Sequence, residues 1–324
     1  MNTVAGKKIG EELFHAGFLG DGDKKFSLTI GIPAYNERGR IGCLLRQVLH
    51  QNTVQLDTII VNTSGSTDGT QEEVFSVAKY YDASYLIEII DSHERAGKAA
   101  ALDAILKACN SDIVIFLDGD VKLHDKCFDE ILKPFLFDDS VGVVSGNVAP
   151  LNGNNEGVFY FISRLERQIH HELCVDLMRK GMAPKVNGTF FAVKRNLISH
   201  LPRHVVSDDE YVSWNAQRKG YRVVYAPKAI VYTKDPESFR DYIAKRRRIF
   251  VGHFLIKKTM GYTVPTARFT KIIPKFLNFL MRDKSELLNF LVMLVMQFAA
   301  YILAISDMIL GNIPYRYRVE SAKF

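Results

Sequence analysis

The chain has 324 residues, 47% of them apolar, which suits one large α/β domain with an appendage or two modest domains. Its formal net charge of +6 suggests an anionic partner, without choosing among nucleic acid, a membrane surface and phosphate-bearing substrates. The four cysteines form no C-x-x-C pair, which argues against a disulfide framework or a zinc site and indicates reduced thiols in a cytosolic compartment.

The N-terminal segment, residues 1–25, contains lysines but no continuous apolar core, so it lacks the pattern of a signal peptide. Its apolar residues Ile9, Leu13, Phe14 and Phe18 can share one helix face. We expect an amphipathic segment that either packs on the following domain or lies on a membrane.

From Phe26 onward, apolar runs bounded by Gly, Asn, Asp and Ser alternate with helix-like stretches. Strands are expected at 26–35, 56–65, 85–91 and 112–120, and helices at 40–51, 70–81 and 97–109. This alternation predicts an α/β fold, a Rossmann-like and mostly parallel sheet with helices on both faces. Ligands of such sheets bind outside the carboxyl ends of the strands.

The second half of the chain has a mixed pattern. Further strands are expected at 141–150, 188–195 and 221–233, and a long helix at 156–180. No internal repeat or low-complexity segment is visible.

The C-terminal part differs in composition. Residues 286–311 are apolar over a length that, as a helix, crosses a bilayer core of about 30 Å, and Gln297 and Asp307 are the only strong interruptions. Residues 256–285 mix bases with Ile, Phe and Leu, as an interfacial helix would. We expect a transmembrane or membrane-embedded helix followed by a basic tail, residues 312–324, and the alternative is a hydrophobic core helix.

Two carboxylates, Asp118 and Asp120, follow directly on a predicted buried strand and are separated only by Gly119. A hard divalent cation binds carboxylate oxygens and keeps room for substrate phosphates. Gly119 permits the turn that would point both side chains toward the same site at the end of the strand. Solvated turn carboxylates are at least as common, so this pair needs support from other motifs.

Three further motifs are expected at the same edge of the sheet. "IPAYNE" (32–37) follows the first strand and "GSTDGT" (65–70) follows the second. "ERAGKAAAL" (94–102) places Arg95 and Lys98 at a helix start, where N–H groups and cations suit a phosphate. Together these motifs predict one cleft for a phosphate-bearing ligand.

In this order the motifs resemble the family 2 inverting glycosyltransferases of the GT-A fold. The resemblance continues through "SDDEYVSWNAQRKGYRVVYAPKAIVY" (207–232) and "SFRDYIAKRRRIFVGH" (238–253). These look like the acidic catalytic motif and the arginine-rich motif of the membrane-associated branch, which includes cellulose, chitin and hyaluronan synthases. The resemblance implies a catalytic domain over residues 26–255, and it is specific for the family rather than for the product.

The resemblance assigns donor-binding residues. Tyr35 and Glu37, with Pro33 before them, would border the nucleotide base and ribose. Arg95 and Lys98 would face the base and the phosphates of the donor.

The resemblance also assigns the reacting groups. Asp118 would hold the donor and, with Asp120, bind a Mg²⁺ or Mn²⁺ ion that bridges its diphosphate. Asp209 would be the catalytic base that takes the proton of an acceptor hydroxyl. Arg248 would contact the pyrophosphate, with Arg246 and Arg247 nearby, and these cations would stabilise the leaving group. An acidic helix start that favours the helix dipole is the alternative interpretation of Asp209 and its neighbours.

Three departures from the family pattern bear on the substrate. Ser64, on the donor side, stands where the family usually has an aspartate that contacts uracil, so a UDP donor cannot be assumed. The arginine motif usually reads Q-x-x-R-W, and here Lys245 and Ile249 replace Gln and Trp, which removes an aromatic surface for an acceptor sugar. Polymer synthases carry several membrane helices, whereas this sequence has one clear candidate.

"IHHE" places His170, His171 and Glu172 on a predicted helix. Adjacent helix residues diverge by about 100°, so a polar helix face is favoured over a metal site.

The sequence therefore predicts a metal-dependent, inverting, hexosyltransferase-type enzyme. It would move a sugar from a nucleotide-diphosphate sugar to a lipid-linked or glycan hydroxyl, with its catalytic domain on the cytoplasmic face of the cell membrane. Membrane lipid is an expected partner and nucleic acid is not, and self-association through the C-terminal helix stays open. A polyprenyl-phosphate acceptor is a close alternative, although an ionised phosphate would need no base such as Asp209.

Two interpretations come from other classes. A sugar nucleotidyltransferase would normally show a G-G-x-G-T-R loop after the first strand, where this chain has "PAYNE". A catalytically silent nucleotide-sugar-binding partner would not be expected to keep Asp120, Asp209 and Arg248.

Overall fold

The computed structural model describes residues 26–51, 56–92, 95–151, 157–202, 205–265, 275–276, 279 and 286–312. The predicted N-terminal amphipathic segment, most of the interfacial segment and nearly all of the basic tail lie outside the described residues.

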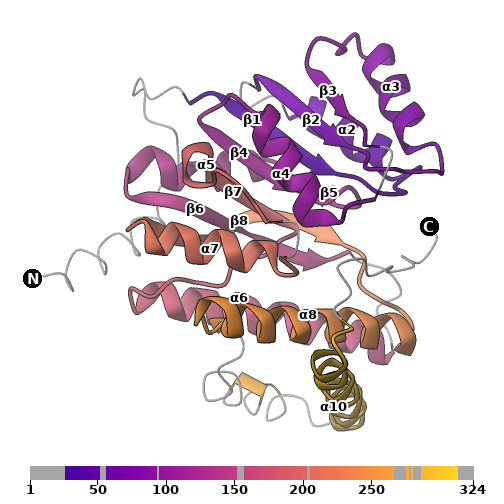
Figure 1. Cartoon of the computed structure of the whole chain (residues 1–324), viewed down its shortest axis with the longest axis vertical. Coiled ribbons are helices and arrows are strands. Elements are labelled where there is room, and N and C mark those ends of the chain that lie inside the picture. Colours follow the sequence, from indigo (N-terminus) through magenta and orange to yellow (C-terminus); the bar gives the residue numbers. More distant parts are fainter. Residues whose placement is uncertain are drawn as a thin grey trace, which may run out of the picture.

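One eight-stranded sheet forms the centre of the domain, in the order β3-β2-β1-β4-β7-β6-β8-β5 (Figure 1). The strands are β1 (Leu28–Pro33), β2 (Thr58–Asn62), β3 (Ile87–Ile90), β4 (Ile113–Leu117), β5 (Lys122–Leu123), β6 (Val141–Pro150), β7 (Phe190–Lys194) and β8 (Arg222–Thr233). Strands β3, β2, β1 and β4 run parallel, as do β6 and β8. Strand β7 is antiparallel to both of its neighbours, and β5 is antiparallel to β8. The predicted α/β fold with a mostly parallel sheet is confirmed.

Helices cover both faces of this sheet. The described helices are α2 (Ile41–Leu49), α3 (Thr70–Tyr80), α4 (Lys98–Ala108), α5 (Cys127–Phe137), α6 (Val158–Arg179), α7 (Asp208–Arg218), α8 (Phe239–Met260) and α10 (Leu287–Leu310), with a short 3₁₀ helix, Arg195–Leu197. Apolar side chains of α2, α3 and α5 form one core with the sheet, and those of α4 and α7 form a second core on the other face. Both faces of the central strands are therefore buried, which explains their continuous apolar sequences.

The close approach of α4 to the sheet depends on a glycine in β1. A Cβ atom on Gly31 would lie 2.8 Å from a methyl carbon of Ile105 and 2.9 Å from the ring of Phe116. This contact fixes α4 against the sheet and with it the position of Lys98 at the first turn of α4.

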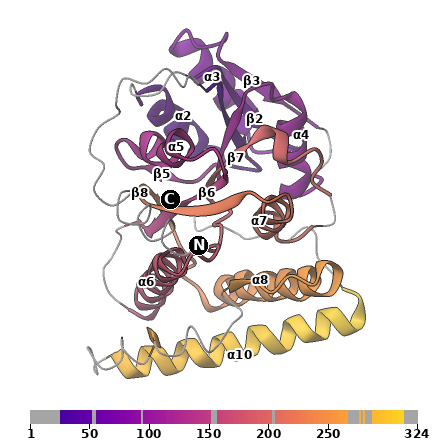
Figure 2. The same ribbon diagram turned by 90° about the vertical axis from the view of Figure 1, so that its left-hand side faces the viewer.

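A third layer lies below the sheet and consists of α6, α8 and α10. Its apolar core includes Phe161 and Leu165 of α6, Tyr242 of α8, and Met293 and Met296 of α10. Figures 1 and 2 show α10 at the lower end of the molecule, beneath α6 and α8 and roughly perpendicular to the long axis of the molecule. Helix α8 runs without a break past residue 255, where the sequence placed the end of the catalytic domain.

Within the described residues, α10 is the one helix long and apolar enough to cross a membrane. Its mean hydropathy is 2.2, and only 22% of the most apolar stretch is buried inside the protein. A core helix of a soluble domain would be mostly buried, so the burial does not favour that alternative.

Candidate active site

The loops that follow β1 and β2 are joined at the carboxyl edge of the sheet. The Ala34 amide donates to the Asn62 carbonyl at 2.8 Å, and the Glu37 amide donates to Thr70 Oγ1 at 2.8 Å. The Thr67 amide donates to Asn36 Oδ1 at 2.9 Å. The predicted convergence of "PAYNE" and "GSTDGT" is therefore present in the structure.

The carboxyl end of β4 brings a cluster of carboxylates to these loops. A Cβ on Gly119 would lie 3.0 Å from Cγ of Glu37, so the glycine allows Glu37 to pack directly on the D-G-D turn. Burial, together with the charges of Asp120 and Asp118, raises the pKa of Glu37 to about 8. Burial and the charge of Asp118 also raise the pKa of Asp120. The neighbouring carboxylates thus oppose the ionisation of Glu37 and Asp120, as happens where a cation would bind.

Lys98 connects the carboxylates to the opposite wall of the site. Its Nζ lies 2.5 Å from Asp118 Oδ1 and donates to the Gly188 carbonyl at 2.9 Å. Burial alone would lower the pKa of Lys98, but the charges of Asp118 and Asp208 and the hydrogen bond to Asp118 raise it. The charge of Arg248 acts in the opposite direction on Lys98, which places Arg248 within electrostatic reach. Lys98 and Asp118 are therefore in direct contact, and Arg248 acts on Lys98 through its charge.

The remaining predicted donor residues line the same loops. The Arg95 guanidinium lies 4.0 Å from the centre of the Tyr35 ring, a cation–π arrangement. Pro33 is the last residue of β1. Ser64 is buried, has a φ of +31° and donates to Asn62 Oδ1, so its hydroxyl is engaged with β2.

Lys185 was not singled out in the sequence, and it holds the acidic start of α7. Its Nζ lies 3.1 Å from Asp209 Oδ2 and 3.0 Å from Glu210 Oε1, and it donates to the Val186 carbonyl at 3.1 Å. Burial alone would raise the pKa of Asp209, but the charge and hydrogen bond of Lys185 and the Glu210 amide hold it below its usual value. Asp209 is therefore kept ionised, as a base must be.

The two carboxylates that flank Asp209 have different environments. Burial raises the pKa of Asp208 to about 6, against the charge of Lys98, and one Asp208 oxygen is buried without a hydrogen-bond partner among the described residues. Burial raises the pKa of Glu210 to about 7, against the charge of Lys185. Of the three carboxylates at this helix start, Asp209 has the strongest support for its ionised form.

The loop from Lys185 to Thr189 joins the two halves of the site. Its Gly188 carbonyl accepts from Lys98, and its Thr189 carbonyl accepts from the Asp118 amide at 3.1 Å. A Cβ on Gly188 would lie 3.4 Å from Cβ of Asp209. The carboxyl edge of β4 and the start of α7 therefore face each other across one short loop.

The arginine-rich motif does not act as one group. Arg246 donates to Gln297 Oε1 of α10 at 3.0 Å, and its NH1 lies 3.8 Å from Glu166 of α6. Arg247 makes a two-point ion pair with Asp307 of α10. Of the three arginines, Arg248 is the one that acts electrostatically on Lys98, so the donor role expected for Arg246 has no support in its contacts.

The histidines of α6 are part of a packed polar helix face. His171 Nδ1 lies 2.9 Å from the Tyr225 hydroxyl, and His170 contacts the Cys174 sulfur at 3.8 Å. Burial lowers the pKa of His170 to about 3. This environment agrees with the interpretation of the pair as a satisfied helix face.

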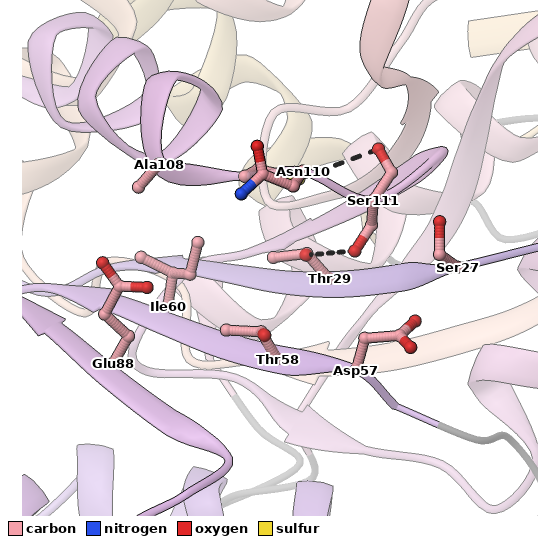
Figure 3. A pocket seen from close by; sticks show the side chains of 10 residues that line it. Ser27, Thr29, Asp57, Thr58, Ile60, Glu88, Ala108, Asn110 and Ser111 are labelled. Carbon is pink, nitrogen blue, oxygen red and sulfur yellow. Dashed lines mark hydrogen bonds between the residues drawn. The ribbon is translucent and has the colours of Figure 1, made fainter.

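A pocket of about 300 Å³ lies at the opposite edge of the sheet (Figure 3). It is lined by residues at the amino ends of β1 and β2, including Ser27, Thr29, Asp57 and Thr58. Its polar groups bond within the protein: Thr29 pairs with Ser111 at 2.8 Å, and Asp57 accepts from the Leu28 amide. It is therefore separate from the candidate active site and carries no reactive arrangement.

Within the described residues, no group of three or more His, Cys, Asp or Glu side chains is arranged to enclose a metal ion. Asp118 and Asp120 would thus supply only part of a coordination shell.

The mostly parallel α/β sheet, with carboxylates at its strand ends, is the arrangement expected of a GT-A fold. Residues 26–252 match the sequence profile described as "Glycosyltransferase like family 2", which covers well over half of the chain. The chain belongs to this family and is a glycosyltransferase.

The curated relatives include poly-beta-1,6-N-acetyl-D-glucosamine synthases. The one from Staphylococcus aureus (strain MSSA476) is 26% identical over 262 residues, which cover 78% of this chain and 61% of the relative. The one from Staphylococcus epidermidis is 23% identical over 254 residues, 76% of this chain and 59% of the relative. The chain thus spans about three-fifths of the length of these relatives.

Among solved structures, the mannosyltransferase PcManGT from Pyrobaculum calidifontis, in complex with GDP-Man and Mn²⁺, is similar with a TM-score of 0.59. The sequence identity is 22%, and the match covers 97% of this chain and 84% of that chain. At this identity the likeness supports the fold.

Proposed function

We propose that this glycosyltransferase moves a sugar, with inversion, from a nucleotide-diphosphate sugar to a hydroxyl of a lipid-linked or glycan acceptor at the membrane. The observation that carries the proposal is the arrangement across the loop 185–189. Lys98 and Asp118 lie on one side of this loop, and Asp209 with its counter-ion Lys185 lies on the other.

The donor side supports a phosphate leaving group. Lys98 lies at the first turn of α4, where backbone N–H groups and the helix dipole also favour an anion. Arg248 lies within electrostatic reach of Lys98. These two cations would stabilise the negative charge that develops on the departing diphosphate.

The acceptor side supports a hydroxyl nucleophile. The acceptor oxygen forms a bond to the anomeric carbon while the bond from that carbon to the diphosphate oxygen breaks. The hydroxyl proton passes to the Asp209 carboxylate, which Lys185 keeps ionised. A phosphate acceptor would not need this base, so the ionised Asp209 favours the hydroxyl.

The carboxylate cluster fits a divalent cation, Mg²⁺ or Mn²⁺. Asp118 and Asp120 would hold it, and the remaining ligands would come from the donor phosphates and water. Burial and the charges of neighbouring carboxylates raise the pKa values of Glu37 and Asp120, a cost that a cation would relieve. When bound, the ion would supply further charge stabilisation to the diphosphate. The Mn²⁺ in the complex of the mannosyltransferase from Pyrobaculum calidifontis is consistent with this proposal.

The membrane location rests on α10 and on the cysteines. Helix α10 is apolar and poorly buried. All four cysteines are free, with Cys43 exposed and the other three buried, which suits a domain on the cytoplasmic side. The polysaccharide made by the staphylococcal relatives supports a glycan as the acceptor.

The test is a donor screen with purified full-length protein in detergent, following release of nucleoside diphosphate with and without an added acceptor. The panel should contain GDP-mannose and UDP-N-acetylglucosamine beside other nucleotide sugars. We expect release from one donor, dependent on Mg²⁺ or Mn²⁺ and abolished in Asp120→Asn. Release of pyrophosphate from a sugar phosphate and a nucleoside triphosphate would identify a nucleotidyltransferase. Binding without any turnover would identify a silent partner.

A further inference from the structure

The exposed surface of α10 is apolar along its whole length. At roughly 100° per residue, the exposed large apolar side chains of α10 fall within about half of the helix circumference. These residues are Leu287, Leu288, Leu291, Leu294, Val295, Phe298, Ile302, Leu303, Ile309 and Leu310. A face so uniformly apolar exceeds what protein–protein interfaces show, because their rims are polar.

The two polar residues that interrupt the apolar sequence of α10 are paired with side chains of α6 and α8. Asp307 is 2% exposed and ion-paired with Arg247. Gln297 accepts from Arg246 and donates to Glu166 Oε1 at 3.3 Å. The two interruptions of the apolar sequence therefore do not face the outer surface.

Helix α10 is also docked from one end to the other. Near its start, Glu286 lies 3.6 Å from Arg164, and the Phe290 ring lies 5.5 Å from the Phe276 ring. In its second half, the Tyr301 ring lies 5.5 Å from the Phe250 ring. The charged layer of α6 and α8 thus accompanies α10 for its full length.

We propose that α10 lies flat in the membrane surface, with its outer face among the acyl chains, and does not cross the bilayer. A crossing helix docked in this way would pull the charged side chains of α6 and α8 into the hydrocarbon, where they are costly. Figures 1 and 2 show α10 across the end of the molecule, an orientation that lets one face meet a membrane while the sheet stays in water. Exposed Lys257 and Lys258 of α8 add charge that suits anionic headgroups.

This inference rests on the membrane location proposed above and adds the orientation of the helix. The occupant of the apolar face is lipid. A second copy of the chain is the competing occupant, and the test below separates the two.

The test is a depth measurement on the full-length protein bound to vesicles of phosphatidylcholine and phosphatidylglycerol. Single cysteines replace Leu288, Val295, Ile302 or Ile309 in a Cys43→Ser background and carry a fluorophore. These four positions are exposed and seven residues apart, so they share one face. The vesicles contain a lipid quencher placed either near the ester carbonyl or near the acyl terminus.

A helix in the surface plane sits about 5–10 Å into the headgroup–acyl boundary, so all four positions should be quenched about equally by the shallow probe and weakly by the deep one. A crossing helix would give the strongest deep quenching at Val295→Cys and Ile302→Cys and shallow quenching at the two ends, which would overturn the proposal. Absence of quenching together with a dimer in solution would show that a second copy covers this face, and would equally overturn it.

The control position is Phe75, which is exposed on α3 at the other end of the molecule and should escape both quenchers. Nucleoside diphosphate release is measured on the same labelled proteins. Lost release with equal shallow quenching would refute the proposed chemistry and leave the orientation standing. Normal release together with the quenching profile of a crossing helix would refute the orientation and leave the proposed chemistry standing.

Discussion

The ion pair between Arg247 and Asp307 allows a sharp stability prediction, because its two members are buried to very different extents. The Asp307 side chain is 2% exposed, whereas the Arg247 side chain is 33% exposed. Arg247→Met removes the two-point ion pair of a buried carboxylate, and breaking a buried pair in this way typically costs about 3–5 kcal/mol. Since Arg247 is partly solvated already, we expect the lower end, about 3 kcal/mol.

The reverse substitution should cost less. In Asp307→Leu the arginine can turn toward water, so we expect a loss of about 1 kcal/mol. The double variant Arg247→Met/Asp307→Leu should recover most of the stability, because an apolar pair of similar volume often replaces a buried ion pair without loss. Arg246→Met is the matched control on α8: it removes a hydrogen bond to the Gln297 amide and a long, partly solvated contact with Glu166, and should cost about 1 kcal/mol.

The assay is thermal unfolding of the four variants in the same detergent. At roughly 2–4 °C per kcal/mol for a domain of this size, Arg247→Met should lower the Tm by about 6–12 °C. Equal losses in Arg247→Met and Asp307→Leu would refute the argument from unequal burial. An unchanged Tm in Arg247→Met would show that α10 does not depend on this pair.

Three further predictions concern the reaction. Lys185→Met should move the acid limb of the pH profile of kcat/KM to higher pH, because the pKa of Asp209 rises when its cationic partner is lost. Lys185→Arg should keep the wild-type limb, and an unmoved limb in Lys185→Met would show that Lys185 does not control the pKa of Asp209. Asp209→Asn should lower transfer by about 10²–10⁴-fold while calorimetry shows normal nucleoside diphosphate binding, and normal transfer would assign the proton elsewhere. Asp120→Asn should abolish the Mn²⁺-dependent turnover with an unchanged melting curve, and near-normal activity of this variant without added metal would refute the cation site.

The first half of the fold could be predicted because local patterns decide it. Each apolar run before residue 120 ends in a Gly-, Asn- or Asp-containing loop, and the parallel strands bring those loops to one edge. That placed Glu37, Lys98 and Asp118 near one another before any contact was known.

The second half depends on long-range pairing that the local pattern does not contain. Strand β7 lies between β4 and β6 and is antiparallel to both. Its position and direction depend on pairing with distant strands, and the sequence of β7 alone does not determine them. Helix α5 was missed, since Pro134 lies inside it and weakens the helical signal. Lys185 gave no signal either: it lies in a loop without periodicity, and only the fold carries it to Asp209.

The arginine-rich motif shows why adjacent residues need not share a role. Successive residues on a helix point about 100° apart, so three consecutive arginines face three directions. Arg246 meets Gln297 and Glu166, Arg247 meets Asp307, and Arg248 acts on Lys98 at the donor side. One turn of α8 therefore contains both the arginines that bind α10 and a cation of the candidate active site. Because α8 is a single unbroken helix here, the contacts with α10 and the position of Arg248 depend on the same rigid segment.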